Sequence, residues 1–198
     1  MFNNIPNLLT FLRIIAIPVF IVIYYLPWSG AHFWATFIFC AAAITDWLDG
    51  YLARKLDQSS AFGAFLDPVA DKLMVVMALI LIIERNPTPF PDIALTLACG
   101  IIIGREIVIS ALREWMAEIG ERAQVAVSII GKIKTLVQMF AIPFLIYQYD
   151  IGDFPTAEVG FVLIWIAATL TMWSMLIYLK DAWPILKNSN NSSATEKQ

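Results

Sequence analysis

Charged side chains are scarce in this sequence, and cysteine and histidine are scarcer still. Only 15% of the 198 residues are charged, against about 25% in an ordinary soluble domain. The net charge of −3 leaves no broad basic surface of the kind that binds nucleic acid, so nucleic acid is excluded as a partner. Cys40 and Cys99 lie in separate apolar runs and His32 stands alone, so the sequence predicts neither a disulfide framework nor a zinc site.

Common catalytic signatures are also missing. The sequence has no serine–histidine constellation, no glycine-rich phosphate loop and no zinc-protease motif, which excludes lipases, P-loop ATPases and metalloproteases. The first apolar segment has no basic leader, contains Arg13, and shows no small-residue cleavage site before Trp28. It is therefore predicted to be a retained membrane helix and not a signal peptide.

Long apolar segments are what the sequence has in abundance, since 60% of its residues are hydrophobic. A bilayer core of roughly 30 Å needs about 20 apolar residues per helix. Only helices or closed barrels pair every backbone polar group in lipid, and these segments are too long for barrel strands. The sequence predicts an all-α integral membrane protein, a bundle of six transmembrane helices over residues 8–26, 32–53, 62–83, 92–112, 130–149 and 157–179.

Basic residues are distributed unevenly between the two ends of these segments. One set of ends carries nearly all the Lys and Arg, and the other has Arg85 as its single base. By the positive-inside rule, both termini and the acidic stretch at 45–72 are predicted to face the cytoplasm. Residues 1–183 are predicted to form one membrane domain, and residues 184–198 a polar, disordered cytoplasmic tail.

Carboxylates are concentrated in the stretch TDWLDGYLARKLDQSSAFGAFLDPVADK, residues 45–72. Asp46 and Asp49 are three residues apart and Asp67 and Asp71 four apart, so each pair projects from one helix face. Four carboxylates at a membrane boundary need compensating positive charge. Ion pairs with neighbouring bases could provide it. A divalent metal is favoured, because clustered oxygen ligands without His or Cys suit Mg²⁺ or Mn²⁺.

Eight residues of this stretch share one spacing, Asp46-x2-Asp49-Gly50-x2-Ala53-Arg54-x8-Gly63-x3-Asp67-x3-Asp71. The pattern resembles the complete signature of the CDP-alcohol phosphatidyltransferase family, with no departure at any position. The family's six-helix architecture agrees with the hydropathy pattern, so the resemblance covers all but the C-terminal tail. It implies transfer of a phosphatidyl group from CDP-diacylglycerol to an alcohol, with release of CMP.

The resemblance also implies roles for individual residues. Asp46 and Asp67 would bridge two ions of Mg²⁺ or Mn²⁺, Asp49 would complete one metal site, and Asp71 would sit at the second as general base. The CDP-lipid would contact Asn7, Thr10, Gly50, Ala53, Arg54, Ser60 and Gly63. Asn7 could instead be a helix N-cap, and Arg54 an anchor at the cytoplasmic boundary.

The later segments GREIVISALREWMAEIG and SIIGKIKTLVQ resemble the bacterial members of the family that use glycerol 3-phosphate and produce phosphatidylglycerophosphate. A phosphorylated acceptor predicts fixed positive charge near the metals. The candidates are Arg105, Arg113, Lys132 and Lys134. The two lysines cannot share a helix face, so one of them is expected to reach the pocket. Glu106 offers a structural alternative, because it could pair with Arg113 or with a base on another helix.

Two arginines lie inside predicted membrane helices, Arg13 in the first and Arg105 in the fourth. An unpaired guanidinium is costly there, so Arg13 is expected to find a carboxylate, a phosphate or water.

Other functions stay open at this point. The acceptor could be inositol phosphate, serine or phosphatidylglycerol, and intramembrane acids also mark the cation pathways of ion-coupled transporters. The absence of inverted repeats and the position of the acids at one boundary argue against a transporter. The resemblance further implies a homodimer. It also implies that the protein lies in the bacterial cytoplasmic (inner) membrane, in contact with membrane lipids, with its active site facing the cytosol.

Overall fold

The computed structural model describes residues 5–56, 61–118 and 129–195. Within them, the side chains of 5–8, 47–56, 61–65, 67, 129–130, 181 and 184–195 lie outside the description. The described residues form six helices: α1 (Ile5–Tyr25), α2 (Ala31–Leu56), α3 (Ala61–Glu84), α4 (Asp92–Glu118), α5 (Ile129–Tyr147) and α6 (Thr156–Thr195).

Each helix coincides with one predicted apolar segment, so the prediction of an all-α chain with six helices is confirmed for the described residues. Two helical segments among them, Asp92–Glu118 and Thr156–Lys180, are long and apolar enough to cross a membrane. Leu9–Tyr25 and Ala31–Asp46 are shorter apolar helical segments.

Two helix ends differ from the sequence prediction. The predicted fourth segment stops at residue 112, where charged residues begin, but α4 continues to Glu118. The residues from Arg113 onward are mostly good helix formers, so the end of an apolar run is not the end of the helix. Similarly, the predicted sixth segment stops at residue 179, but α6 continues to Thr195. Extending an existing helix is far easier than nucleating one, and residues 185–195 contain no Gly or Pro to stop it.

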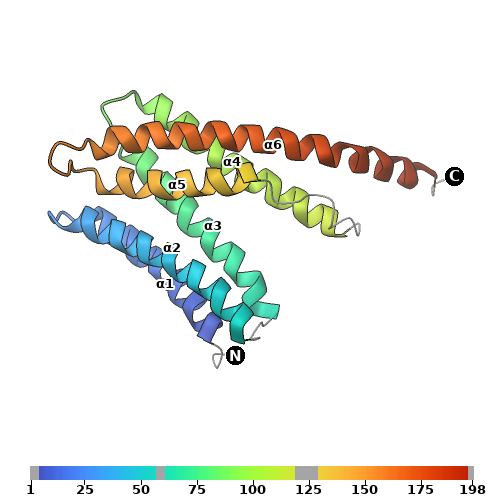
Figure 1. The fold of residues 1–198 in the computed structure, drawn as a ribbon, viewed down its shortest axis with the longest axis horizontal. Helices are drawn as coiled ribbons and strands as arrows, with labels where there is room; N and C mark the ends of the chain where they lie inside the picture. Colours follow the sequence, from blue (N-terminus) through green and yellow to red (C-terminus); the bar gives the residue numbers. More distant parts are fainter. Residues whose placement is uncertain (1–4, 57–60, 119–128, 196–198) are drawn as a thin grey trace.

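The helices form two pairs joined by a crossing helix. Figure 1 shows α1 beside α2 and α5 beside α6, with α3 passing between the pairs. The fourth helix packs against α6 and α3, and α2 reaches α5. This arrangement brings residues from α1 to α5 to the walls of one cavity.

The core between the helices is apolar, and so is much of the outer surface. Phe20 of α1, Phe39 of α2 and Ile102 of α4 are completely or almost completely buried. On the outside, Ile44 is 65% exposed and Ile93 64% exposed, among many other large hydrophobic side chains. An apolar surface on this scale matches lipid better than water as its surroundings.

The helices α5 and α6 approach each other closely at Gly160. A Cβ at this position would lie 2.9 Å from Cγ of Leu145 and 3.2 Å from its backbone nitrogen. Small residues permit such close approach between membrane helices. Cys40 of α2 and Cys99 of α4 are free thiols, the first partly buried and the second buried.

The connection after α5 is fixed by polar contacts at the end of the bundle opposite the acidic stretch of residues 45–72. Gln148 has a left-handed backbone, with φ of 68°, directly after the last residue of α5. Its side-chain amide donates to Oη of Tyr24 over 3.2 Å, and that hydroxyl donates to the carbonyl of Leu81 over 3.3 Å. These bonds tie the end of α5 to α1 and α3.

Candidate functional site

The guanidinium of Arg13 lies between two carboxylates of the acidic stretch. Its Nη1 is 3.1 Å from Oδ1 of Asp46 in α2, and it also pairs with Oδ1 of Asp71 in α3. The Arg13 side chain is only 2% exposed, whereas those of Asp46 and Asp71 are 41% and 37% exposed. The expectation that Arg13 would find a carboxylate is therefore confirmed, and one cation from α1 joins the acidic ends of α2 and α3.

Local sequence explains how the three side chains meet. The helices α2 and α3 are consecutive, so the end of one and the start of the other lie at the same end of the bundle. Arg13 is three residues after Thr10, and both side chains are buried, at 3% and 1% exposure. Three residues are about one helical turn, so Thr10 and Arg13 lie on the same face of α1, and this face is turned towards the aspartates.

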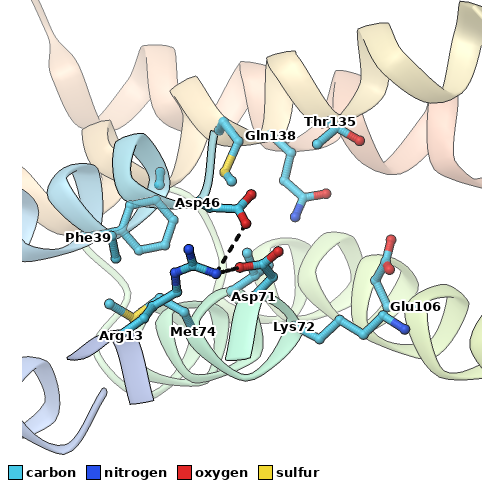
Figure 2. A pocket seen from close by; sticks show the side chains of 13 residues that line it. Arg13, Phe39, Asp46, Asp71, Lys72, Met74, Glu106, Thr135 and Gln138 are labelled. Atoms are coloured by element: carbon cyan, nitrogen blue, oxygen red, sulfur yellow. Dashed lines mark hydrogen bonds and ion pairs between the residues drawn. The ribbon is translucent and has the colours of Figure 1, made fainter. Parts of the chain in front are cut away.

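Next to these residues is a cavity of about 200 Å³ bounded by α1 to α5 (Figure 2). Its polar lining consists of Arg13, Asp46, Asp71, Lys72, Glu106, Thr135 and Gln138. Phe39, Met74 and Met139 contribute apolar walls. The cavity thus combines carboxylates, cations and apolar surface, which is the usual composition of a small-molecule site.

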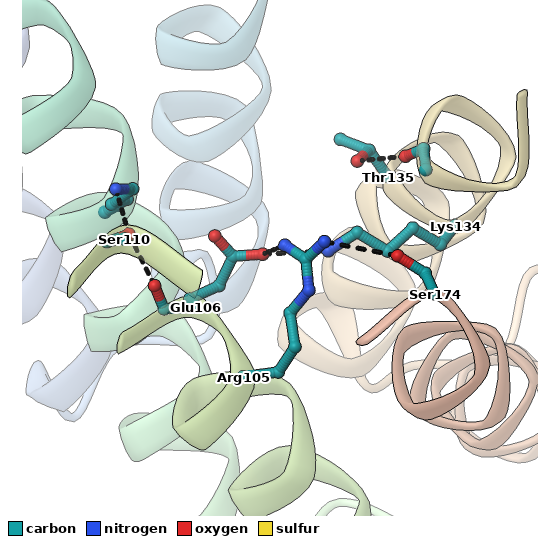
Figure 3. Close-up of polar contacts among 8 residues, drawn as sticks. Arg105, Glu106, Ser110, Lys134, Thr135 and Ser174 are labelled. Carbon is teal, nitrogen blue, oxygen red and sulfur yellow. Dashed lines mark hydrogen bonds and ion pairs between the residues drawn. The ribbon is translucent and has the colours of Figure 1, made fainter. Parts of the chain in front are cut away.

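A second polar cluster lies beside this cavity, between α4, α5 and α6 (Figure 3). Oε1 of Glu106 accepts hydrogen bonds from Nη1 of Arg105 over 3.0 Å and from Nζ of Lys134 over 2.8 Å. Nη2 of Arg105 also donates to the hydroxyl of Ser174 over 3.2 Å. Two cations share one anion, so these three charged groups together carry one uncompensated positive charge.

The two polar clusters are linked through α3 and α4. The ammonium of Lys72, the residue after Asp71, donates to the hydroxyl of Ser110. That hydroxyl donates to the backbone carbonyl of Glu106. These bonds hold the α4 segment that carries Glu106 against the α3 segment that carries Asp71.

The four basic candidates from the sequence lie in three different environments. Arg105 and Lys134 come together at Glu106, with side chains only 9% and 4% exposed, but neither lines the cavity. Lys132 is exposed, so Lys134 is the lysine of the pair that turns inward. Arg113 stands with its guanidinium carbon 5.6 Å from the ring centroid of Tyr178 in α6. Glu106 pairs with a base on another helix and not with Arg113.

Several predicted site residues cannot be placed at the level of side chains. Ser60 lies outside the described residues. Others belong to described helices, but their side chains lie outside the description: Asn7 in α1, Asp49, Gly50, Ala53 and Arg54 in α2, and Gly63 and Asp67 in α3. Their predicted roles stay predictions.

The residues that are described fit an oxygen-ligated cation. Asp46 and Asp71 come from different helices and converge on one positive group, Nη1 of Arg13. Within the described side chains, no group of three His, Cys, Asp or Glu residues is close enough to hold a metal ion. Two of the four predicted ligands, Asp49 and Asp67, fall outside that set. The available donors are carboxylate oxygens, which suit Mg²⁺ or Mn²⁺.

Several polar residues of the site have no role assigned from the sequence. They include Arg13, which the sequence marks only as a costly charge, and Gln138 and Ser174, which are not among the predicted site residues. Gln138 is four residues after Lys134, on the same face of α5, and is 5% exposed. The four-residue spacing could have identified Gln138 from the sequence as a neighbour of Lys134 on the inward face of α5. Ser174 is a single hydroxyl in an apolar run, and only the packing of α6 on α4 identifies its partner.

Comparison with known proteins adds a family match. The model of the CDP-alcohol phosphatidyltransferase family matches residues 3–173. The chain is 51% identical, over 179 residues, to proteins from Escherichia coli strain K12, Shigella flexneri and Salmonella typhimurium. The alignments cover 90% of this chain and 94% of each relative. Each of these relatives is named CDP-diacylglycerol–glycerol-3-phosphate 3-phosphatidyltransferase.

Proposed function

The chain belongs to the CDP-alcohol phosphatidyltransferase family, and from this premise we propose that it makes phosphatidylglycerophosphate. The donor is CDP-diacylglycerol, the acceptor is sn-glycerol 3-phosphate, and the second product is CMP. The observation that carries the proposal is that a single cavity is lined by Asp46 and Asp71 on one side and by Glu106, the centre of a cationic cluster, on the other.

The transfer needs an acceptor hydroxyl beside a proton acceptor. The hydroxyl oxygen attacks the phosphorus atom that bears the diacylglycerol group, the bond from that phosphorus to the CMP oxygen breaks, and the hydroxyl proton is lost. Asp71 is the base in this proposal, because its carboxylate is 37% exposed at the cavity and is held by Arg13. The other carboxylate held by Arg13, Asp46, belongs to the donor side.

A divalent ion is part of the proposal. Asp46, Asp49, Asp67 and Asp71 would hold Mg²⁺ or Mn²⁺. When bound, such an ion neutralises the negative charge that develops on the diphosphate. The support is the convergence of two carboxylates from α2 and α3 on the same cation, together with the family signature.

The acceptor phosphate is assigned to the basic cluster of α4 and α5. Arg105 and Lys134 lie within 3.0 Å of a single carboxylate oxygen, so two donors can meet one anionic oxygen here. The pair still carries one positive charge beyond the charge of Glu106, and buried charges are usually paired. Arg113 and Lys132 stay weaker candidates, because one stacks on Tyr178 and the other is exposed.

We also propose that all six helices span the bacterial inner membrane, with both termini and the cavity on the cytosolic side, and that the enzyme is a homodimer. Exposed apolar side chains on α1, α2 and α4 support the embedding. The distribution of Lys and Arg supports the orientation. The homodimer is carried over from the family resemblance.

A panel of acceptors tests this function. The purified protein is supplied with CDP-diacylglycerol, Mg²⁺ and, in turn, glycerol 3-phosphate, inositol phosphate, serine or phosphatidylglycerol, and released CMP is measured. Glycerol 3-phosphate is expected to give the highest kcat/KM. A better second acceptor would keep the family and overturn the acceptor assignment. CMP release with no acceptor in the panel would indicate hydrolysis, and no CMP release at all would contradict the transferase assignment.

A further inference from the structure

Glu106 differs from the other charged residues of its cluster because it alone reaches the cavity. Arg105 and Lys134 are 9% and 4% exposed and do not line the cavity, whereas Glu106 is 23% exposed and does. Glu106 therefore presents its carboxylate to the cavity, beside the two cations assigned to the acceptor phosphate.

The two oxygens of Glu106 have different surroundings. Both cations bond Oε1. Among the residues whose side chains are described, none forms a hydrogen bond or ion pair with Oε2. Figure 3 shows this second oxygen turned away from Arg105 and Lys134. Glu106 therefore has one oxygen held by two ion pairs and another that is available to a ligand.

An ionised carboxylate oxygen accepts hydrogen bonds and donates none. It therefore attracts a hydroxyl group of the acceptor, whereas the acceptor phosphate is drawn to Arg105 and Lys134. The carbonyl of Glu106 is also held through Ser110 to Lys72, which follows Asp71 in α3. Asp71 and Glu106 line the same cavity, so an acceptor whose reacting hydroxyl is at Asp71 can extend its neighbouring carbon atoms towards Glu106.

We propose that Glu106 determines acceptor specificity by accepting a hydrogen bond, through Oε2, from the hydroxyl on the carbon next to the reacting one. This inference rests on the proposed function, because it takes glycerol 3-phosphate as the acceptor and Asp71 as the base. In glycerol 3-phosphate the group recognised is the hydroxyl at C2. Arg105 and Lys134 act in part as positioning residues that fix the orientation of this carboxylate.

The test compares two acceptors that differ only in this hydroxyl. One is glycerol 3-phosphate, and the other is 3-hydroxypropyl phosphate, which lacks the oxygen at C2. The unmodified enzyme is expected to favour glycerol 3-phosphate in kcat/KM by roughly tenfold to a hundredfold, the range for a hydrogen bond to a charged group. In Glu106→Gln this preference should fall several-fold, because a neutral amide replaces the charged acceptor.

The ratio of the two acceptors separates recognition from a structural role. If Glu106 only holds Arg105 and Lys134 in place, Glu106→Gln lowers kcat/KM for both acceptors by the same factor and the ratio is unchanged, which overturns the proposal. Thr135→Val is the matched control on the cavity wall. The Thr135 hydroxyl already donates to the carbonyl of Gly131 over 2.9 Å, so this variant should keep the wild-type ratio.

The unmodified enzyme also gives an answer if Glu106→Gln does not fold. Equal use of the two acceptors by the wild-type protein would refute recognition of the C2 hydroxyl while leaving the proposed function intact. Failure of glycerol 3-phosphate to release CMP from CDP-diacylglycerol would reject the proposed function and this inference together. The two failures are therefore distinguishable in one set of assays.

Discussion

Nη1 of Arg13 lies 3.1 Å from Oδ1 of Asp46, and the two residues are 33 positions apart in the sequence. The guanidinium is almost completely buried, so its positive charge depends on the carboxylates around it. Removing one partner of a buried ion pair leaves an uncompensated charge, and this usually costs far more than the pair itself contributes.

Arg13→Met should therefore destabilise the fold. The expected loss is about 3 kcal/mol, the lower end of the range for buried pairs, because both aspartates are partly exposed. The measurement is thermal unfolding in detergent with excess EDTA, so that metal binding does not contribute. Arg85→Met is the matched control, since Arg85 forms an exposed pair with Glu84 at 3.4 Å. Pairs of that kind contribute about 0–1 kcal/mol. Equal effects of the two substitutions would contradict the structural role of Arg13.

Chelation should abolish turnover reversibly. Carboxylate ligands bind Mg²⁺ or Mn²⁺ without forming a closed cage, so EDTA can remove the ion and added metal can restore it. CMP release is measured before EDTA treatment, after it, and after addition of Mg²⁺, Mn²⁺ or Zn²⁺. Full turnover after extensive chelation would rule out the metal proposal.

Asp71→Asn and Asp46→Asn should fail in different ways. The first removes the proton acceptor, so CDP-lipid binding at saturating Mg²⁺ should persist while kcat falls by about 10²–10⁴-fold. The second should weaken metal and CDP-lipid binding together, because a bridging carboxylate has no neutral equivalent. Donor affinity and single-turnover CMP release are measured for both variants. An Asp71→Asn enzyme with more than about a tenth of wild-type kcat would retain too much activity to have lost its general base.

Lys134 and Lys132 provide a matched pair for the acceptor site. Lys134 is buried and bonded to Glu106. Lys132, two residues earlier on α5, is exposed on a different face of the helix. Lys134→Met should raise the apparent KM for glycerol 3-phosphate by roughly tenfold or more, the effect of losing a charged hydrogen bond, with a smaller change for CDP-diacylglycerol. Lys132→Met should leave both KM values within about twofold, as for most surface changes. A larger acceptor effect at Lys132 would reverse the assignment.

Gly160 should be sensitive to a single methyl group. In Gly160→Ala the new Cβ meets Cγ of Leu145 at 2.9 Å and the Leu145 backbone nitrogen at 3.2 Å, so α5 and α6 must separate. Overpacking of this kind costs about 1–3 kcal/mol. Gly104→Ala on α4 is the control, because nothing lies within 4 Å of its added Cβ. Thermal unfolding in detergent should show a lower midpoint for the Gly160 variant only.

The number and type of helices in the described residues could be predicted because each helix contains one of the apolar runs of the sequence. The helix ends could not, since hydropathy changes at Arg113 but helix propensity does not, and α4 continues to Glu118. In the site, helix periodicity correctly predicted that Lys132 and Lys134, two residues apart, point in different directions. It could not decide which of them turns inward, because that depends on how α5 packs against α4.

The partners of Arg13 and Glu106 were beyond sequence reasoning for the same physical reason. Burial predicts that a charge is paired, but it does not say with which of several carboxylates or bases. The pairing of Glu106 with Lys134 joins residues 28 positions apart, and that of Arg13 with Asp71 joins residues 58 positions apart. Contacts of this range are set by the packing of whole helices.

The position of Arg13 in the first helix has a consequence for biosynthesis. A chain is made from its N-terminus, so α1 is complete before Asp46 and Asp71 have been added. During that interval a guanidinium within an apolar helix costs about 2.5–3.5 kcal/mol on the scale of membrane insertion. In the proposed membrane arrangement, stable insertion of α1 is therefore coupled to the synthesis of α2 and α3. A ribosome-bound fragment that ends before residue 46 lacks both carboxylates that pair with Arg13.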